Sequence, residues 1–299
     1  MATVTQHPKA SAALEPRRSR RRRLPFSPWH LLLLPTAVVF ALPLVQMVMT
    51  SLMSDREINR FPPRFFPSHI SLGTGGKDEG GYVGLFTGSE VLRWTMNTVI
   101  VSGVAIVSHL VLCSLAGYGF ARLKFPGRTF GFFAIVGTIM IPTQLLMIPT
   151  YVMFSRLGII NTLASAIVPW LASAFGIFLM RQFFLSLPKE LEEAARLDGC
   201  TQFGIFWRIV LPLAKPALAT LAIFTLLSSW NDLIWPLIAI NNEHNYTLQI
   251  GLANFQSTRR TQWSLLMAGN VVATAPLIVF FMLAQKHFVA TMTFSGLKG

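Results

Sequence analysis

Residues 94–121 read WTMNTVIVSGVAIVSHLVLCSLAGYGFA, a run of 28 positions that holds no Asp, Glu, Lys or Arg. A helix needs about 20 mostly apolar residues to cross a bilayer, so this run is long enough. Its apolar residues follow one another without the alternation that is typical of a barrel strand. The run therefore predicts a helix that spans a membrane.

Five further stretches have the same character. They are residues 24–54, 129–155, 157–180, 216–242 and 261–285, of which one, 216–242, is interrupted by a charge, Asp232. Six such runs predict six spanning helices and an all-α polytopic membrane protein.

The composition of the 299-residue chain agrees with this class. Hydrophobic residues make up 53% of it. Charged residues make up 12%, about half the share usual in soluble domains. These values exclude an ordinary soluble enzyme and a disordered chain. The net charge is +13, but seven of the 25 cations lie in the first 23 residues, directly before an apolar run. That placement favours a role in membrane topology over nucleic-acid binding.

The apolar runs divide the chain. We expect a basic N-terminal tail at 1–28, a first helix at 29–53, an irregular external loop at 54–92, a main membrane domain at 93–290 and a C-terminal tail at 291–299. The first helix is longer than the apolar core of a signal peptide and has no clear A-x-A site after it, so we expect it to be retained.

The distribution of Lys and Arg predicts the orientation. If the N-terminus lies in the cytoplasm, the inner segments hold 17 of these cations and the outer segments hold 8. Cytoplasmic loops carry the excess of Lys and Arg. We therefore expect both termini to be cytoplasmic.

The predicted cytoplasmic segment 186–212 has helix signals of its own. Ser186 is a suitable N-cap, and Pro188 fits the first turn. Acidic side chains favour the positive end of the helix dipole. Three follow here: Glu190, Glu192 and Glu193. Gly199 suits a left-handed stop. These signals predict a helix over 187–198, about 18 Å long.

A second, returning helix is predicted from Thr201 to Leu211. One apolar face of this helix has helical spacing and consists of Phe203, Phe206, Trp207 and Val210. Pro212 is expected to end it. The two helices would form a rigid protrusion that is too polar for lipid and suited to a soluble partner.

The same segment resembles a known family. Glu193-Ala194-Ala195, then Gly199 after three residues and Ile209-Val210-Leu211-Pro212 after nine more, is similar to the EAA loop of binding-protein-dependent ABC importer permeases. The resemblance covers most of the chain after residue 28. It includes Asn97-Thr-Val, Tyr118 to Gly127, Trp230 to Pro236, Gln285 to Val289 and Gly296 to Gly299. These motifs resemble the MalG-like subunits of carbohydrate importers.

The resemblance implies a type I importer permease fold in the inner membrane of a bacterium, with a cytoplasmic coupling helix. It implies a heterodimer with a second, homologous permease subunit, two ATP-binding subunits that hold ATP and Mg, and an external solute-binding protein. No cofactor is expected in this chain. Coupling to the ATPase is assigned to Glu190, Glu193, Ala194, Ala195, Asp198, Gly199, Ile209, Leu211 and Pro212.

Motifs for catalysis are missing from the sequence. It has no G-x-x-x-x-G-K-[ST], no H-E-x-x-H, no G-x-S-x-G and no Cys/His metal cluster. We therefore expect a transport subunit that depends on separate ATPases, and not an enzyme.

Candidates for the solute pathway centre on Asp232, because an ionisable residue within an apolar run is a functional hypothesis. Hydrogen bonds and ring contacts to a polyol are expected from its neighbours Trp230, Asn231 and Trp235, and Asn97 is a further candidate. An equally weighted alternative places Asp232 near the outer end of its span, paired with Arg259 or Arg260.

The expected solute is a sugar, most simply an oligosaccharide. A glycerol-phosphate-type solute is the close alternative, but a phosphate favours basic pathway residues and the apolar runs hold no Lys or Arg. From a different class, a stand-alone secondary transporter or channel would need coupling residues in its spans. Asp232 alone qualifies, and it leaves segment 186–212 unexplained.

Overall fold

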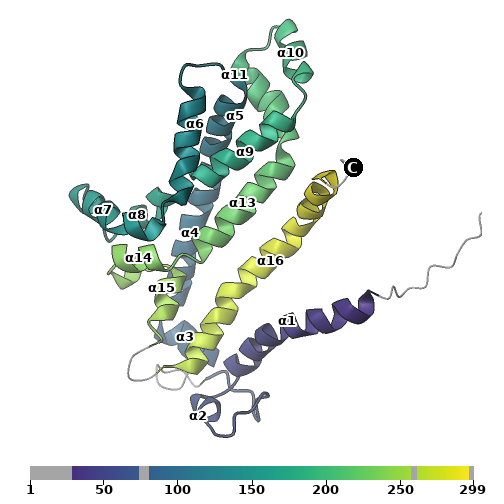
Figure 1. The fold of residues 1–299 in the computed structure, drawn as a ribbon. Coiled ribbons are helices and arrows are strands. Elements are labelled where there is room, and N and C mark those ends of the chain that lie inside the picture. The colour runs from purple at the N-terminus through teal and green to yellow at the C-terminus, as the bar shows by residue number, and fades with distance from the viewer. Residues whose placement is uncertain (1–28, 74–80, 257–260, 296–299) are drawn as a thin grey trace, which may run out of the picture. The chain divides into compact units, whose positions relative to one another are not determined.

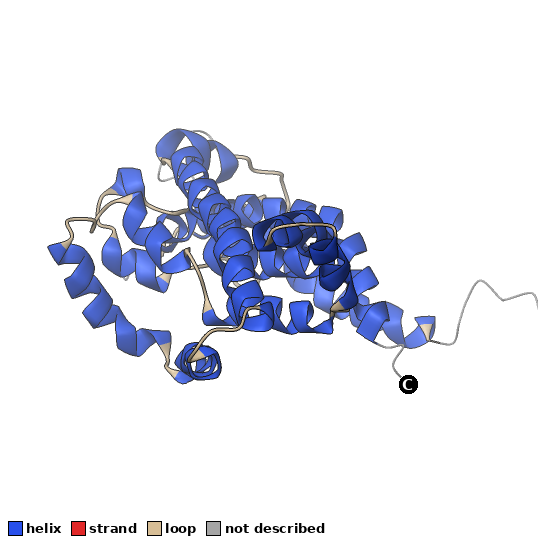
Figure 2. Ribbon diagram, turned by 90° about the horizontal axis from the view of Figure 1, so that it is seen from above, coloured by secondary structure: helices blue, strands red, loops and turns tan. Residues whose placement is uncertain are grey.

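The structure is a computed structural model that describes residues 29–73, 81–256 and 261–295. These residues are almost entirely helical, with an isolated antiparallel bridge between Gln256 and Thr261 (Figure 2). The α-helices are α1 (His30–Ser51), α2 (Asp55–Ile58), α3 (Gly81–Gly88), α4 (Val91–Ser108), α5 (Ser114–Arg122), α6 (Arg128–Gly137), α7 (Thr143–Arg156), α8 (Leu163–Ile167), α9 (Ala174–Ser186), α10 (Glu190–Leu197), α11 (Gln202–Ile205), α12 (Leu211–Leu213), α13 (Lys215–Trp230), α14 (Ile234–Ala239), α15 (Leu248–Ala253) and α16 (Trp263–Ser295).

Shorter turns of other helix types lie between them. Two are π-helical, η1 (His109–Cys113) and η4 (Phe206–Val210), and three are 3₁₀-helical, η2 (Thr138–Met140), η3 (Val168–Trp170) and η5 (Glu243–Asn245). The predicted all-α class is confirmed.

The chain divides into two units, one that ends at Val45 and one that starts at Gln46. The described part of the first unit is most of α1, whose apolar side chains are exposed around the helix, as Leu31 and Phe40 illustrate. A helix that is apolar on all sides suits lipid better than water.

Four of the described helical stretches are long and apolar enough to cross a membrane, and there are up to six if each of two bent pairs is one span. The four are His30–Ser51, Val91–Arg122, Leu163–Ser186 and Trp263–Leu283. The run quoted first, 94–121, lies within Val91–Arg122, where α4, η1 and α5 follow one another without a break.

The run 129–155 is not the single straight helix that we expected. Arg128–Met140 and Thr143–Arg156 meet at 103°. Ile141 is extended, and Pro142 follows it as the N-cap of α7. Proline has no N–H and disfavours helical geometry in the residue before it, which explains a bend at this place.

The run 216–242 is also interrupted. Helix α13 ends at Trp230 and does not continue to residue 242. The candidate span that contains it is a bent pair, Gln202–Leu213 followed by Lys215–Trp230, and the two helices meet at 77°. Asn231 Nδ2 donates to the carbonyl of Leu227 at 2.7 Å, a local bond that competes with helix continuation. Pro236 cannot donate to the Asp232 carbonyl, so the helix does not continue through this point.

The run 157–180 is displaced. The helical stretch starts at Leu163 and continues to Ser186, past Arg181. This cation is accommodated because its guanidinium lies 3.9 Å from the centroid of the Phe132 ring and its Nε donates to the Phe120 carbonyl.

Two predicted non-helical segments are partly helical. Residues 54–92 hold α2 and α3, and Leu85 of α3 is fully buried, so this segment is not wholly irregular. Helix α16 extends to Ser295, into the predicted tail 291–299. The predicted tail 1–28 lies outside the described residues.

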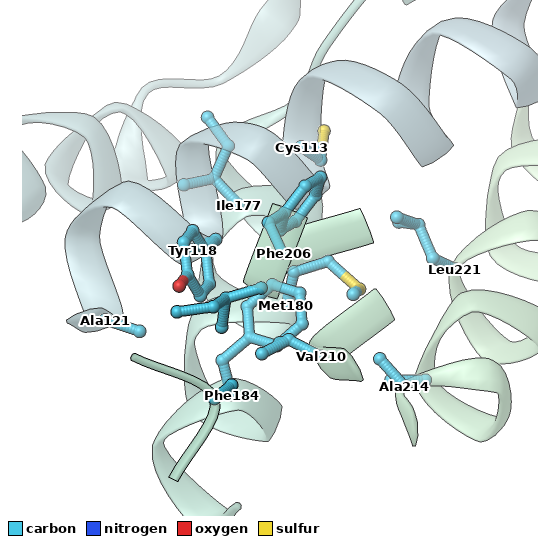
Figure 3. Close-up of a cluster of buried hydrophobic side chains, with 13 residues drawn as sticks. Cys113, Tyr118, Ala121, Ile177, Met180, Phe184, Phe206, Val210, Ala214 and Leu221 are labelled. Atoms are coloured by element: carbon cyan, nitrogen blue, oxygen red, sulfur yellow. The ribbon is translucent and has the colours of Figure 1, made fainter. Parts of the chain in front are cut away.

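One buried cluster fixes the part of the fold that carries the candidate site (Figure 3). It joins α5, α9, α11 and α13 through side chains that include Tyr118, Met180, Phe184 and Phe206. Helices α5 and α9 approach closely because Gly117 faces Met180: a Cβ built at Gly117 would lie 2.8 Å from that of Met180. The Tyr118 ring meets Phe184 edge-on at 5.8 Å.

Candidate functional site

A hairpin of two short helices, α10 and the α11–α12 segment, protrudes beyond the ends of α5 and α9 (Figure 1). Helix α10 covers Glu190–Leu197 and is shorter than the predicted 187–198. Ser186 is not its N-cap. This residue ends α9, where its hydroxyl donates to the Phe183 carbonyl at 2.7 Å, and Lys189 occupies the N-cap position. Eight residues make a helix about 12 Å long.

The C-terminal stop of α10 is as predicted. Gly199 has φ of +81°, in the left-handed region. Its N–H donates to the Arg196 carbonyl at 3.0 Å, and the Cys200 N–H donates to the Ala195 carbonyl at 2.9 Å. These two bonds form a Schellman motif, which satisfies carbonyls that the end of a helix leaves free.

The outward face of α10 combines acidic and apolar side chains. Glu190, Glu193 and Ala194 are exposed, and Leu197 is 90% exposed. Asp198, the C-cap, is exposed as well. Leu197 thus lies beside acidic side chains, and the outward face of α10 is not uniformly polar.

The inward face carries a carboxylate that the sequence analysis did not single out. Glu192 is 5% exposed, and its Oε1 lies 2.8 Å from Nε of Arg122, the last residue of α5. Its other oxygen, Oε2, accepts a hydrogen bond from the Tyr118 hydroxyl at 3.2 Å. Ala195, one turn further along, is also buried. Glu192 therefore holds α10 against α5, while Glu193 faces outward.

Further contacts complete this attachment. Arg122 Nη2 donates to the Leu187 carbonyl at 2.6 Å, and the Gln202 amide donates to the Tyr118 hydroxyl. The Nε–Oε1 approach lacks hydrogen-bond alignment, and Arg122 Nη1 has no acceptor among the described groups. Removing one partner of a buried ion pair typically destabilises a protein by about 3–5 kcal/mol. No sequence pattern pointed to this pair, since its residues lie on separate segments.

The returning helix starts where it was predicted to start. Thr201 is its N-cap and its hydroxyl accepts from the Gly204 N–H at 3.2 Å. The helix does not end at Pro212: α12 includes this proline and continues to Leu213. Pro212 is the last residue but one of the continuous helical stretch Gln202–Leu213.

The predicted apolar face of this helix is only half buried. Phe206 and Val210 are buried, but Phe203 and Trp207 are exposed. The π-helical turn Phe206–Val210 changes the register that uniform α-helical spacing assumed. Ile209 and Leu211 pack against the buried cluster of Figure 3.

Three of the five solute-pathway candidates are buried and use their donors inside the chain. Asn97 Nδ2 donates to the carbonyls of His244 and Tyr246, both at 2.9 Å. Trp230 Nε1 donates to Ala273, and Trp235 Nε1 donates to Ser165. The two tryptophans thus point to different neighbours, and they do not form one platform beside Asn231.

The other two candidates lie at the break after α13. Asn231 is exposed, and Asp232 is half-buried. Oδ2 of Asp232 accepts a hydrogen bond from Trp170 Nε1 at 3.1 Å. The alternative to a pathway role pairs Asp232 with Arg259 or Arg260, and both arginines lie outside the described residues.

Apolar spans joined to a protruding helical hairpin are the features of an integral membrane protein. Within the ranges that the structure describes, no three His, Cys, Asp or Glu side chains gather as a metal site would require.

The chain belongs to the family of binding-protein-dependent transport system inner membrane components, whose match covers residues 109–294. It is 34% identical over 285 residues to the arabinooligosaccharides transport system permease protein AraQ of Halalkalibacterium halodurans, covering 94% of this chain and 100% of that protein. It is 31% identical over 262 residues to the sn-glycerol-3-phosphate transport system permease protein UgpE of Brucella abortus, covering 87% and 93%.

Solved structures share the fold. A bacterial ABC transporter involved in the import of the acidic polysaccharide alginate superimposes with a TM-score of 0.74 at 24% identity, over 88% of this chain and 99% of that chain. The MetNI methionine ABC transporter gives a TM-score of 0.54 over 67% of this chain and 95% of that chain. The predicted importer permease fold is confirmed.

Proposed function

We propose that this chain is the permease subunit of an ATP-driven importer and forms half of the pathway for a sugar. The observation that carries the proposal is the two-sided character of α10. Its inward face is fixed to α5 through Glu192, and its outward face presents Glu193 and Leu197. A helix that transmits movement must contact a soluble ATPase with one face and the spanning helices with the other.

In the proposed assembly, a second, homologous permease subunit completes the pathway. Two ATP-binding subunits hold ATP and Mg, and an external protein delivers the solute. The N- and C-termini and α10 lie on the cytoplasmic side of a bacterial inner membrane. The excess of 17 cations over 8 on that side supports the orientation. Glu190, Glu193, Ala194, Asp198 and the corner at Gly199 form the coupling surface toward the ATPase. Ala195, Ile209 and Leu211 support it from within, and the exposed Pro212 follows them on the returning arm.

An oligosaccharide is the solute that we favour, and arabinooligosaccharides appear in the name of one relative. Glycerol phosphate, in the name of another, is the close alternative. A phosphate is best held by a cation within the pathway. Arg181, which lies within the candidate span Leu163–Ser186, already contacts Phe132 and Phe120 near the end of its helix, which favours a neutral solute.

A secondary transporter or channel remains the alternative from another class. It would make α10 an ordinary surface helix. The family match argues against that, because the family is that of inner membrane components of binding-protein-dependent transport systems.

The test is uptake by the complex reconstituted in liposomes, with arabino-oligosaccharides and sn-glycerol-3-phosphate offered in turn. We expect ATP-dependent uptake of the oligosaccharide. Solute movement by the purified subunit alone, without nucleotide hydrolysis, would contradict the proposal.

Docking is tested separately by Glu193→Lys. We expect this variant to reach the membrane and to lose co-purification of the ATPase, because it reverses a charge on the outward face. Glu243→Lys is the matched control: it reverses an exposed carboxylate in η5, which packs at the opposite end of the Val91–Arg122 span. Equal ATPase recovery in the two variants would rule out docking through α10.

A further inference from the structure

We propose that the Arg122–Glu192 ion pair is a positioning contact that passes the movement of α10 directly to the Val91–Arg122 span. The proposal rests on the proposed docking of α10. It adds a route to the two through the chain itself, one back through residues 187–189 to α9 and one from Gly199 through α11 and α12 to α13. Movement of the ATPase would then reach three spans together.

The geometry of α5 supports this route. Tyr118 and Arg122 are one helical turn apart and face the same neighbour, and both contact Glu192. The side chains of Arg122 and Glu192 are 4% and 6% exposed, so solvent does not screen their attraction. Arg122 also holds the Leu187 carbonyl at the entry to α10. A displacement of α10 therefore acts on the last turn of α5 through Glu192 and through the Leu187 carbonyl.

Stability alone is a weak reason for such a pair. Replacing a buried ion pair with well-packed apolar side chains is often neutral or stabilising. This pair is also incompletely satisfied, because Arg122 Nε and Nη1 and Glu192 Oε1 have no aligned hydrogen-bond partner among the described groups. Stability is therefore not a sufficient reason for the pair.

The test uses Glu192→Gln and the double variant Arg122→Met with Glu192→Gln, each in the complete complex in liposomes. Glutamine keeps an acceptor for Tyr118 and removes the charge, and the double variant leaves no unpaired buried charge. The measurement is the amount of sugar imported per ATP hydrolysed. We expect the complex to assemble and hydrolyse ATP, and the ratio to fall by about fivefold or more, the usual lower range of coupling between sites.

Arg196→Gln is the matched control. Arg196 also approaches Glu192, but at 4.0 Å and with half of its side chain exposed. This variant should keep the wild-type ratio. The proposal is overturned if the ratio stays unchanged in both test variants, if Arg196→Gln lowers it equally, or if both test variants fail to assemble. Failure of docking is distinguishable, because Glu193→Lys would then retain the ATPase whatever happens at Glu192.

Discussion

The indole nitrogen of Trp170 and the carboxylate of Asp232 lie 3.1 Å apart, although 62 residues separate them in the chain. The bond joins η3 to the break between α13 and α14. In the described part of the chain, Asp232 is thus held by a neutral donor and forms no ion pair. Its charge is free to act on something else.

Asp232→Asn tests that charge. Asparagine has the same shape and keeps an oxygen that can accept from Trp170, so we expect wild-type amounts of the subunit in the membrane. Hydrogen bonds to a charged group are worth about 1.5–3 kcal/mol, and a solute that uses the carboxylate would lose such a contact. We expect slower sugar uptake, measured with labelled sugar at several concentrations. Unchanged kinetics would remove Asp232 from the pathway.

Gly117→Ala tests the close packing of α5 on α9. A Cβ at this position would lie 2.8 Å from Met180 Cβ and 2.9 Å from the Arg181 nitrogen, and the latter belongs to the backbone. The helices must separate, so we expect a loss of about 1–3 kcal/mol in stability, seen as a lower melting temperature in detergent.

Gly119→Ala on the same helix is the comparison. A Cβ there meets nothing within 4 Å. Alanine is a better helix former than glycine by about 1 kcal/mol, so this variant should melt at the wild-type temperature or above it. Equal destabilisation of both variants would show that the close approach of Gly117 to Met180 does not set the effect.

The effect of a substitution at Gly199 should depend on how well the new residue adopts a left-handed backbone conformation, and not on steric contact of its side chain. A Cβ at this residue has no neighbour within 4 Å, but φ is +81°. The left-handed region costs L-residues about 1–2 kcal/mol, less for asparagine. We expect Gly199→Asn to retain most ATPase recovery in co-purification and Gly199→Val to lose most of it. Equal recovery would mean that the corner is not required for docking.

Leu197→Ser should separate docking from folding. The side chain is 90% exposed, so the permease itself should keep its stability within about 0.5 kcal/mol. If the ATPase covers this side chain, the affinity should fall about tenfold, the equivalent of about 1.4 kcal/mol. Titration of the purified ATPase onto permease variants in nanodiscs measures this, and an unchanged affinity places Leu197 outside the interface.

Some local signals in the sequence were reliable and others were not: Ser186 is not the N-cap of α10 and Pro212 does not end the returning helix. Thr201 caps its helix and Gly199 ends α10, because both effects depend on the backbone within three or four residues. The apolar runs also located the spans. Counting charges could not locate the breaks within them, because the break at Pro142 arises from a missing N–H and not from polarity.

Features that depend on distant partners were not predictable in this way. Glu192 looked like any other glutamate in a helical first turn, and its burial follows from Arg122, 70 residues earlier. Arg181 marks the end of an apolar run in the sequence, yet the helix continues past it, and its guanidinium makes a cation–π contact with the Phe132 ring. The indole N–H groups of Trp230 and Trp235 donate to carbonyls on other helices, which their place next to Asn231 in the sequence did not indicate; their contact with a solute stays a prediction.

The π-helical turn at Phe206–Val210 has a consequence for how the chain can change in length. A π-turn is an α-helix with one residue inserted, so deleting one residue there restores regular winding and leaves both flanks aligned. The same deletion inside α10 would rotate everything beyond it by about 100° and carry Leu197 off its face.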